Sequence, residues 1–238
     1  MERLDKIISA TGKKSRREVR EMVRQGRVLV DGKPAPAADM KVDPQTAVIL
    51  LDGEPLGYEK FTYVMLHKPA GVLTATEDRR QETVLDLLPP ELRRRALSPV
   101  GRLDKDTEGL LLLTNDGQLA HRLLSPKSHV DKVYYARVDG ALEPGDIAAF
   151  AAGMTLGDGF ECLPADLEIL SPTEALVTLR EGKFHQVKRM VAACGKEVTN
   201  LQRLTMGPLQ LDPALAPGEW RRLTTDELER LTIFKVEL

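Results

Sequence analysis

The chain of 238 residues has little of what several kinds of protein require. Two cysteines, Cys162 and Cys194, exclude a disulfide framework, and no Cys or His pair has zinc-ligand spacing. No apolar run approaches the length of a membrane span. The N-terminus lacks the apolar stretch and cleavage site of a signal peptide. We therefore expect a cytoplasmic, metal-free protein that does not contact a membrane.

Charge is unevenly distributed along the chain. The first 33 residues carry ten Lys and Arg against five Asp and Glu, a balance of +5, so the total of −2 leaves −7 for the remainder. A basic segment followed by a mildly acidic body indicates that the first part binds a polyanion. A solvated helix face has the same composition, and charge alone does not decide between the two.

The basic segment predicts two helices and a hairpin. Residues 4, 7 and 8 are apolar at helical spacing, and Ser15 to Glu18 form a capping box for a second helix. Two strand-like runs end in Asp-Gly turns, at 31–32 and 52–53. The polar, turn-rich stretch 52–59 marks a boundary, and we assign residues 1–58 and 59–238 to two domains.

The capping box, the basic helix face, Gly26 and the turn at 31–32 occur in the order typical of a known module. They resemble the small RNA-binding domain of ribosomal small-subunit protein four, over about the first fifty residues. The resemblance implies RNA binding through phosphate contacts from helix-borne arginines. The candidate contacts are Lys13, Lys14, Arg16, Arg17 and Arg20.

From Phe61 onward, strand and helix signals alternate. The run "LLLLT" at 110–114 is short and continuously apolar, which predicts a buried central strand. Alternating patterns predict strands within 131–140 and 174–182, and "FHQVKRMVAACG" predicts a helix that ends at Gly195. The pattern indicates an α/β fold without giving the strand order.

The stretch "GRLDKDTEG" (101–109) places charged side chains directly before those leucines, and three interpretations compete. A calcium loop needs a bidentate Glu where Asn115 stands, so we exclude it. A two-carboxylate glycosidase site would use Asp104 and Asp106, but nothing in the sequence fixes their separation. The third interpretation is a polar turn before a core strand, which the spacing alone favours.

Further motifs add another interpretation of this stretch. Gly101-Arg102-Leu103-Asp104, followed by "DT", "GLL" and "TNDG", resembles the signature of the RsuA-type ribosomal pseudouridine synthases. Four other segments match that family in order: "HKPAGVLTATED", "SPKSHVDKVYYARV" with its Lys132-x-Tyr134, "EGKFHQVKRM" and "RLTMGPLQLDPALAPGEWRRLT". The match spans essentially the whole chain. It implies a catalytic body of the α/β (α+β) class with a central mixed, mainly antiparallel sheet, and an isomerase that needs no cofactor.

The resemblance also implies roles for individual residues. Asp104 is the family's indispensable aspartate, which must be ionised close to the nucleotide. Lys188, where many relatives carry Arg, is its positive partner. Tyr134 stacks under a target base that has left its helix, in a chain with only 4% aromatics. Arg102 fills the vacated space or binds a phosphate.

The remaining assignments complete the hypothesis. Lys68 and Arg203 are RNA contacts, His185 is structural, and Asp106 and Glu108 shape the loop or are solvated. The stretches "EGKFHQVKRM" and "LAPGEWRRLT" resemble the small-subunit group of the family. We therefore expect a monomer that modifies one uridine of 16S rRNA, in a partly assembled small-subunit particle. The alternatives are a 23S rRNA enzyme and a catalytically silent RNA-binding or ribosome-assembly protein.

Overall fold

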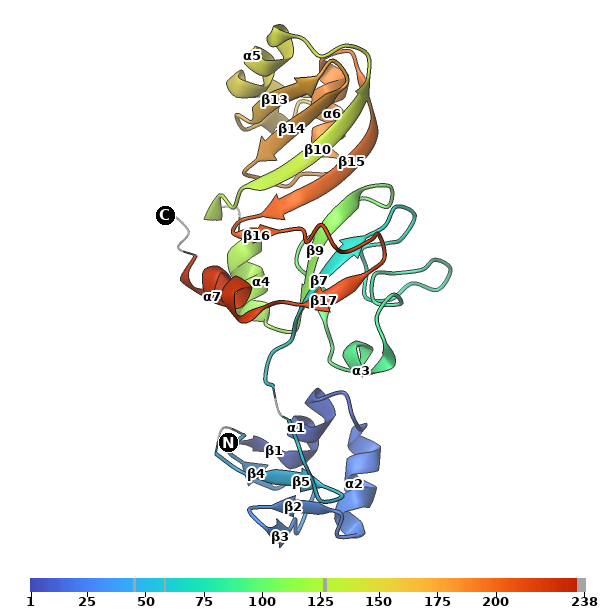
Figure 1. The fold of residues 1–238 in the computed structure, drawn as a ribbon, viewed down its shortest axis with the longest axis vertical. Helices are drawn as coiled ribbons and strands as arrows, with labels where there is room; N and C mark the ends of the chain where they lie inside the picture. Colours follow the sequence, from blue (N-terminus) through green and yellow to red (C-terminus); the bar gives the residue numbers. More distant parts are fainter. Residues whose placement is uncertain (45, 58, 126–127, 235–238) are drawn as a thin grey trace. The chain divides into compact units, whose positions relative to one another are not determined.

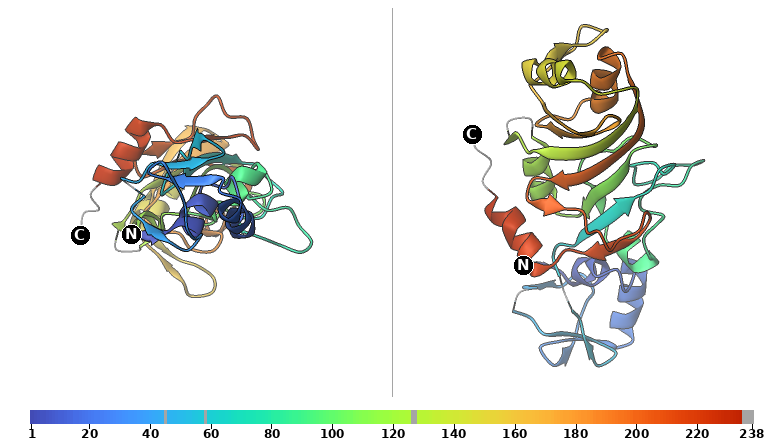
Figure 2. Two further views of the ribbon diagram at one scale, coloured as in Figure 1. Left: turned by 90° about the horizontal axis from the view of Figure 1, so that it is seen from below. Right: turned by 45° about the horizontal axis from the view of Figure 1, so that its top comes forward.

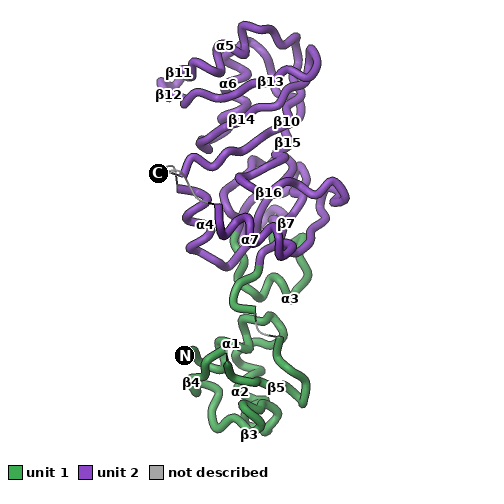
Figure 3. Tube along the Cα trace, turned by 60° about the vertical axis from the view of Figure 1, so that its left-hand side comes forward, with its two compact units in different colours: residues 1–62, 85–98 green, residues 63–84, 99–238 purple. Residues whose placement is uncertain are grey.

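The computed structural model describes residues 1–44, 46–57, 59–125 and 128–234. The chain forms two compact units (Figures 1 and 3), which are described separately. Unit 1 consists of Met1–Thr62 and Leu85–Ser98, and unit 2 of Tyr63–Val84 and Pro99–Leu238. The predicted boundary residue Tyr58 lies outside the described residues, and the assignment of 1–58 and 59–238 to two domains stays a prediction.

Unit 1 contains the two expected helices and a small sheet. The helices are α1 (Leu4–Ala10) and α2 (Arg16–Arg24), and β1 (Glu2–Arg3) pairs with β4 (Lys41–Val42). The four-stranded sheet has the order β3 (Lys33–Pro34), β2 (Val28–Val30), β5 (Ile49–Leu51), β6 (Glu54–Pro55). Eleven buried side chains between residues 4 and 51 form its core, with Leu4, Ile7, Ile8 and Val19 fully covered.

Local sequence signals account for the helix and the turns of unit 1. The predicted capping box is confirmed: the Glu18 amide donates to Ser15 Oγ at 3.3 Å, and the Ser15 amide donates to Glu18 Oε2 at 2.7 Å. The hairpin prediction is also confirmed, since Asp31 and Gly32 both have positive φ, 52° and 78°. Two consecutive residues of positive φ form the turn whose twist matches that of the strands.

Unit 1 also takes in residues 85–98 from further along the chain. Its helix α3 (Pro90–Arg93) begins at the second of two prolines, with Pro89 as N-cap. This segment packs on Gly12: a Cβ there would lie 2.0 Å from the Glu91 carbonyl oxygen. The Arg94 guanidinium donates to the Gly12 carbonyl at 3.4 Å. No sequence pattern predicted this association.

Unit 2 is built on a nine-stranded sheet. Its path is β13 (Asp166–Ser171), β14 (Glu174–Leu179), β10 (Lys132–Asp139), β15 (Glu197–Met206), β9 (Glu108–Thr114), β7 (Tyr63–Lys68) and β17 (Trp220–Arg222). Two short strands join it, β16 (Leu209–Gln210) on β15 and β8 (Ser98–Pro99) on β9. Only β15 and β9 pair in parallel among these described strands. The expected mixed, mainly antiparallel sheet is therefore confirmed.

Helices cover parts of this sheet, and its central strand β9 is buried. They are α4 (Gly117–Leu124), α5 (Pro144–Ala152), α6 (Gln186–Ala193) and α7 (Thr225–Ile233), and a two-stranded ribbon joins β11 (Met154–Thr155) to β12 (Glu161–Cys162). The run 110–113 of β9 is completely buried, which confirms the predicted central strand. Figure 2 shows β10 and β15 side by side over most of their length. Of the helices described, none is long and apolar enough to span a membrane.

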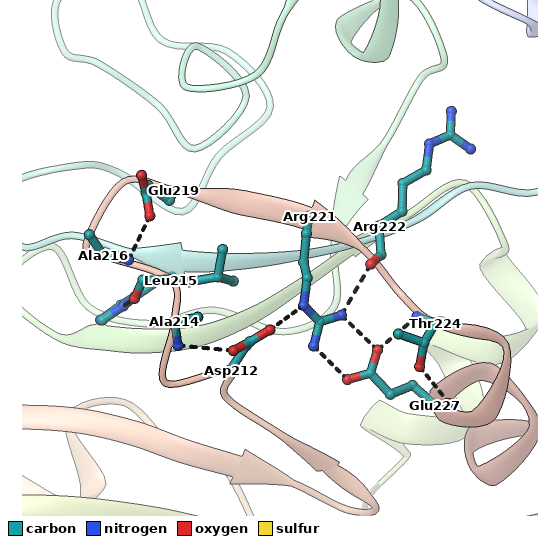
Figure 4. A network of polar contacts seen from close by, with 10 residues as sticks. Asp212, Ala214, Leu215, Ala216, Glu219, Arg221, Arg222, Thr224 and Glu227 are labelled. Atoms are coloured by element: carbon teal, nitrogen blue, oxygen red, sulfur yellow. Dashed lines mark hydrogen bonds and ion pairs between the residues drawn. The ribbon is translucent and has the colours of Figure 1, made fainter.

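A polar network fixes the last strand to the last helix (Figure 4). Arg221 on β17 donates from Nε to Asp212 Oδ2 at 2.6 Å, and both terminal nitrogens donate to the Glu227 carboxylate at 2.8 Å. This guanidinium holds the pKa of the Glu227 carboxyl below its usual range. Glu227 also forms a capping box with Thr224 at the start of α7. The segment 212–227 is therefore stabilised as one unit at the edge of the sheet.

Candidate functional site

The loop 101–107 carries its charged side chains over a fixed backbone. Leu103 is buried, and Thr74 holds its backbone on both sides, donating to the Leu103 carbonyl at 2.7 Å and accepting from its amide at 3.3 Å. The Gly71 amide donates to the Lys105 carbonyl at 2.7 Å. The loop thus passes from a buried anchor to the leucines of β9, and Asp104 is left a quarter exposed. This path of the loop explains why charged side chains stand directly before a core strand in the sequence.

Asp104 lines a cleft of about 340 Å³ in unit 2. Its walls come from the loop 101–107, from the segment 179–187 that leads into α6, and from β10 and β15. Two basic side chains approach the carboxylate: Lys188 Nζ lies 3.7 Å from Oδ2, and His185 Nε2 lies 3.4 Å from Oδ1. The predicted partner Lys188 is therefore within ion-pair distance, and the sequence did not predict the contact of His185.

Lys188 has a second and closer partner in the same loop. Its Nζ lies 2.5 Å from Asp106 Oδ1. This hydrogen bond is the main reason that the pKa of Asp106 falls below its usual value. Lys188 therefore bridges the two carboxylates. Of the two interpretations of Asp106, this contact favours a role in shaping the loop, although the side chain is 73% exposed.

Tyr134 and its neighbour Tyr135 lie in different surroundings. Tyr134 lines the cleft and exposes 9% of its surface, opposite Arg203 in the register of β10 and β15. Tyr135, one residue on, hydrogen-bonds the Glu174 carboxylate at 2.5 Å instead. Successive strand residues face opposite sides of a sheet, so only Tyr134 is available to a base in the cleft.

The rim of the cleft is cationic and apolar. Arg102 and Lys183 are exposed and line it. Phe184 is 74% exposed and stacks on His185, with ring centroids 3.8 Å apart and planes at 19°. His185 has a left-handed backbone, φ 50°, at the N-cap of α6. This turn presents the aromatic pair beside Asp104.

The two remaining RNA-contact predictions in this unit, Lys68 and Arg203, concern buried side chains. Lys68 is completely buried, and its ammonium donates to the carbonyls of Pro69, Lys105 and Thr107 at 2.9, 3.2 and 2.9 Å. It therefore supports the loop from beneath and cannot contact RNA, so that prediction is wrong. Arg203 is only 2% exposed. It lines the cleft, so a group inside the cleft can approach it, and its RNA contact stays a prediction.

The candidate RNA contacts of unit 1 gather around the start of α2. Lys13 is exposed and Lys14 half-buried, and α2 adds a basic face of exposed arginines: Arg16, Arg17, Arg20 and Arg24. The opposite face of the helix is buried through Val19 and Met22. The sequence missed Arg3, which lines a shallow depression with Arg20 and Arg24 and also pairs with the fully buried Asp5 at 2.9 Å.

Within the part of the chain that the structure describes, no three His, Cys, Asp or Glu side chains gather as metal ligands would. Burial raises the pKa of both cysteine thiols, Cys162 and Cys194, which keeps them in the less reactive neutral form.

Comparisons with known proteins agree with this geometry. Residues 62–193 match the RNA pseudouridylate synthase family model, and residues 2–48 match the S4 domain model. An uncharacterized RNA pseudouridine synthase of Bacillus subtilis is 52% identical over 96% of this chain and 98% of its own length. Ribosomal small subunit pseudouridine synthase A of Escherichia coli is 40% identical over 95% of this chain and 98% of its own.

A solved structure supports the same relationship over the full length. The crystal structure of a pseudouridylate synthase superposes with a TM-score of 0.69 at 37% identity, covering 97% of this chain and all of that one. The family model places the loop 101–107, Tyr134 and Lys188 within its matched region. The chain belongs to the RNA pseudouridine synthase family, in its RsuA type, with an S4 domain at its N-terminus.

Proposed function

We propose that the chain converts a single uridine of 16S rRNA to pseudouridine, with Asp104 as the essential carboxylate. The observation that carries this proposal is the placement of Asp104 in the cleft, 3.7 Å from Lys188 and in the same cavity as Tyr134. Relatives named ribosomal small subunit pseudouridine synthase A, 39–40% identical over 95% of the chain, support the choice of rRNA.

The reaction breaks the C1′–N1 bond of uridine and joins C1′ to C5 of the same base. A carboxylate can attack C1′, attack C6 of the uracil, or take a proton from the sugar, and each route needs an ionised group held against the nucleotide. All three routes therefore make the same demand of Asp104, which is a carboxylate held against the nucleotide. Lys188 and His185 lie 3.7 and 3.4 Å from the two oxygens of the Asp104 carboxylate.

The target base must leave its stack to reach this carboxylate. A cleft of about 340 Å³ is large enough for one pyrimidine, and the face of Tyr134 replaces the lost stacking. Exposed Arg102 at the rim then fills the space that the base leaves or binds a neighbouring phosphate. The basic face of α2, with Lys13 and Lys14, binds RNA phosphates elsewhere on the substrate.

An exposed aromatic side chain beside the cleft favours recognition of a particular RNA loop. Phe184 presents a free ring face beside the cleft, and a splayed-out base next to the target stacks on it. RNA loops are recognised through such unstacked bases. We propose that the enzyme acts as a monomer, on folded rRNA in a partly assembled small-subunit particle.

The test incubates the pure protein with 16S rRNA, 23S rRNA and small-subunit assembly intermediates and maps pseudouridine. One modified position in 16S rRNA is expected, and Asp104→Asn abolishes it while RNA affinity is nearly unchanged. The matched control, Asp106→Asn, keeps turnover. Modification of 23S rRNA alone would refute the substrate, turnover by Asp104→Asn would refute the role of the carboxylate, and binding without any product would identify a silent assembly factor.

A further inference from the structure

The floor of the cleft is formed by two buried cations. Lys132 and Tyr134 are two residues apart on β10 and so share a face, and Arg203 lies opposite Tyr134 on β15. All three line the cleft, and Lys132 and Arg203 expose 9% and 2% of their surfaces. A buried lysine or arginine is rare unless an anion pairs with it.

Neither cation has such a partner in the described ranges 1–44, 46–57, 59–125 and 128–234. Arg203 donates from Nε to the Leu110 carbonyl at 2.9 Å, and its buried Nη2 has no hydrogen-bond acceptor there. Of the three Lys132 donors, one is used, to the Val130 carbonyl at 3.0 Å. No carboxylate lies within 4.0 Å of either group among those residues.

The two cations also oppose each other. Burial is the main reason that the pKa of Lys132 falls to about 8, and the charge of Arg203 contributes to this shift. Asp131 and Glu181 act in the opposite direction, each from outside ion-pair distance. Taking two like charges out of water is unfavourable unless an anion compensates them. An unpaired donor and an unneutralised pair of charges together indicate that the site is completed by an anion.

We propose that Lys132 and Arg203 stabilise the negative charge that develops on the detached uracil, an inference that rests on the proposed function. When the C1′–N1 bond breaks, its electron pair stays on the base and spreads over N1 and the two carbonyl oxygens. C1′ is meanwhile held by Asp104, or C2′ gives up a proton to Asp104, which returns it to C2′ as the C1′–C5 bond forms. The C1′–C5 bond then forms, the proton leaves C5 and N1 gains one, so that one hydrogen has moved and no oxidant is needed.

The anion that fits this floor is the base rather than a phosphate. A backbone phosphate is hydrated and charged throughout the reaction, whereas exposed Arg102 and Lys183 at the rim are accessible to it without desolvation. The uracil anion exists only between the two bond changes. Cations that interact with a negative charge present only at that stage accelerate the step and do not tighten substrate binding.

The experiment compares Lys132→Met with the wild type on the RNA that the wild type modifies. Single-turnover rates of C1′–N1 bond cleavage are measured at neutral pH with uridine and with 5-fluorouridine at the target position, beside the affinity for RNA. Fluorine replaces the hydrogen that C5 must lose, so the second base reports this cleavage and not the final loss of a proton from C5. We expect the rate on uridine to fall by about 10²–10³-fold with little change in affinity. The loss is at least about tenfold smaller with 5-fluorouridine, because fluorine already stabilises the departing anion. The control Lys183→Met, at the rim, lowers both rates equally.

Equal losses on both bases, or a loss that appears only as weaker and less salt-dependent binding, would overturn the proposal. A second variant, Lys132→Arg, tests the proposal if Lys132→Met does not fold. The wild-type rate on uridine falls as Lys132 loses its proton above pH 8, whereas Lys132→Arg keeps its rate there. Parallel pH profiles for these two proteins would equally overturn it. A wild type that forms no pseudouridine in any RNA would instead refute the proposed function itself.

Discussion

Replacing Lys188 by Met removes the cation that bridges the two carboxylates of the loop 101–107. Lys188 Nζ lies 3.7 Å from Asp104 and 2.5 Å from Asp106. The Lys188 and Asp104 side chains are only 22% and 25% exposed, whereas Asp106 is 73% exposed. We therefore expect the variant to act mainly through Asp104, since the charge of Asp106 is already screened by water.

Coulomb's law gives the size of the effect. At 3.7 Å two unit charges attract by about 4.5 kcal/mol at an effective dielectric constant of ~20 and by about 1.1 kcal/mol at ~80. A quarter-exposed pair lies between these limits, so the loss of Lys188 slows turnover by roughly tenfold to a thousandfold. Asp106→Asn instead frees Lys188 to approach Asp104 to ~2.8 Å, a change of about 0.4–1.4 kcal/mol, which alters turnover by less than about tenfold.

The assay is single-turnover pseudouridine formation for Lys188→Met, Lys188→Arg and Asp106→Asn. Without the cation, the negative charge of the Asp104 carboxylate loses its nearby counter-charge, so the Met variant is slower than the wild type. Lys188→Arg recovers part of the rate, because the charge returns with a different shape. A Met variant with the wild-type rate would refute the pairing, as would an Asp106→Asn variant that is inactive.

Three further results are expected. Replacing the four arginines of the basic face by Gln, in the full chain, lowers the log–log salt slope of RNA binding by about 0.7–0.9 per lost phosphate contact; an unchanged slope means that the face is only solvated. Arg221→Met leaves Glu227 unpaired and lowers the free energy of unfolding in urea by about 1–3 kcal/mol, and an unchanged midpoint would contradict the network. Burial lowers the pKa of Lys68 from its usual 10.5 to about 8. Native Lys68 therefore releases its proton between these values while the unfolded chain keeps it, so the wild type gains stability relative to Lys68→Met as pH rises through this range; a constant difference would contradict it.

Local features of the fold were predictable because their causes lie within a few residues. The capping boxes at Ser15 and Thr224 and the Asp-Gly turn at 31–32 are each set by side chains at most three positions apart. The central strand 110–114 follows from its unbroken apolar run. The family's motif selected Tyr134 over Tyr135, and the pleat of β10 places only the former in the cleft.

Contacts between distant segments were not predictable from the sequence. Lys188 meets Asp106 across 82 residues, and no local pattern sets which carboxylate lies nearer. Lys68 looks like a surface residue by its type, but three carbonyls of two separate segments accept its protons and bury it. Arg203 also looks like a surface residue by its type, but the pairing of β15 with β9 and β10 places it inside the protein. Burial of a charge depends on acceptors that only the tertiary fold supplies.

The position of β7 in the sheet has a consequence for synthesis on the ribosome. β7 pairs on one side with β9, at residues 108–114, and on the other with β17, at residues 220–222. About 150 residues separate its end at Lys68 from Trp220, which takes roughly 8–30 s to translate at 5–20 residues per second. Val64, Met65 and Leu66 are completely buried in the finished protein. During that interval this apolar strand has an unpaired edge, so the nascent chain is open to chaperones and to aggregation until its last strand emerges.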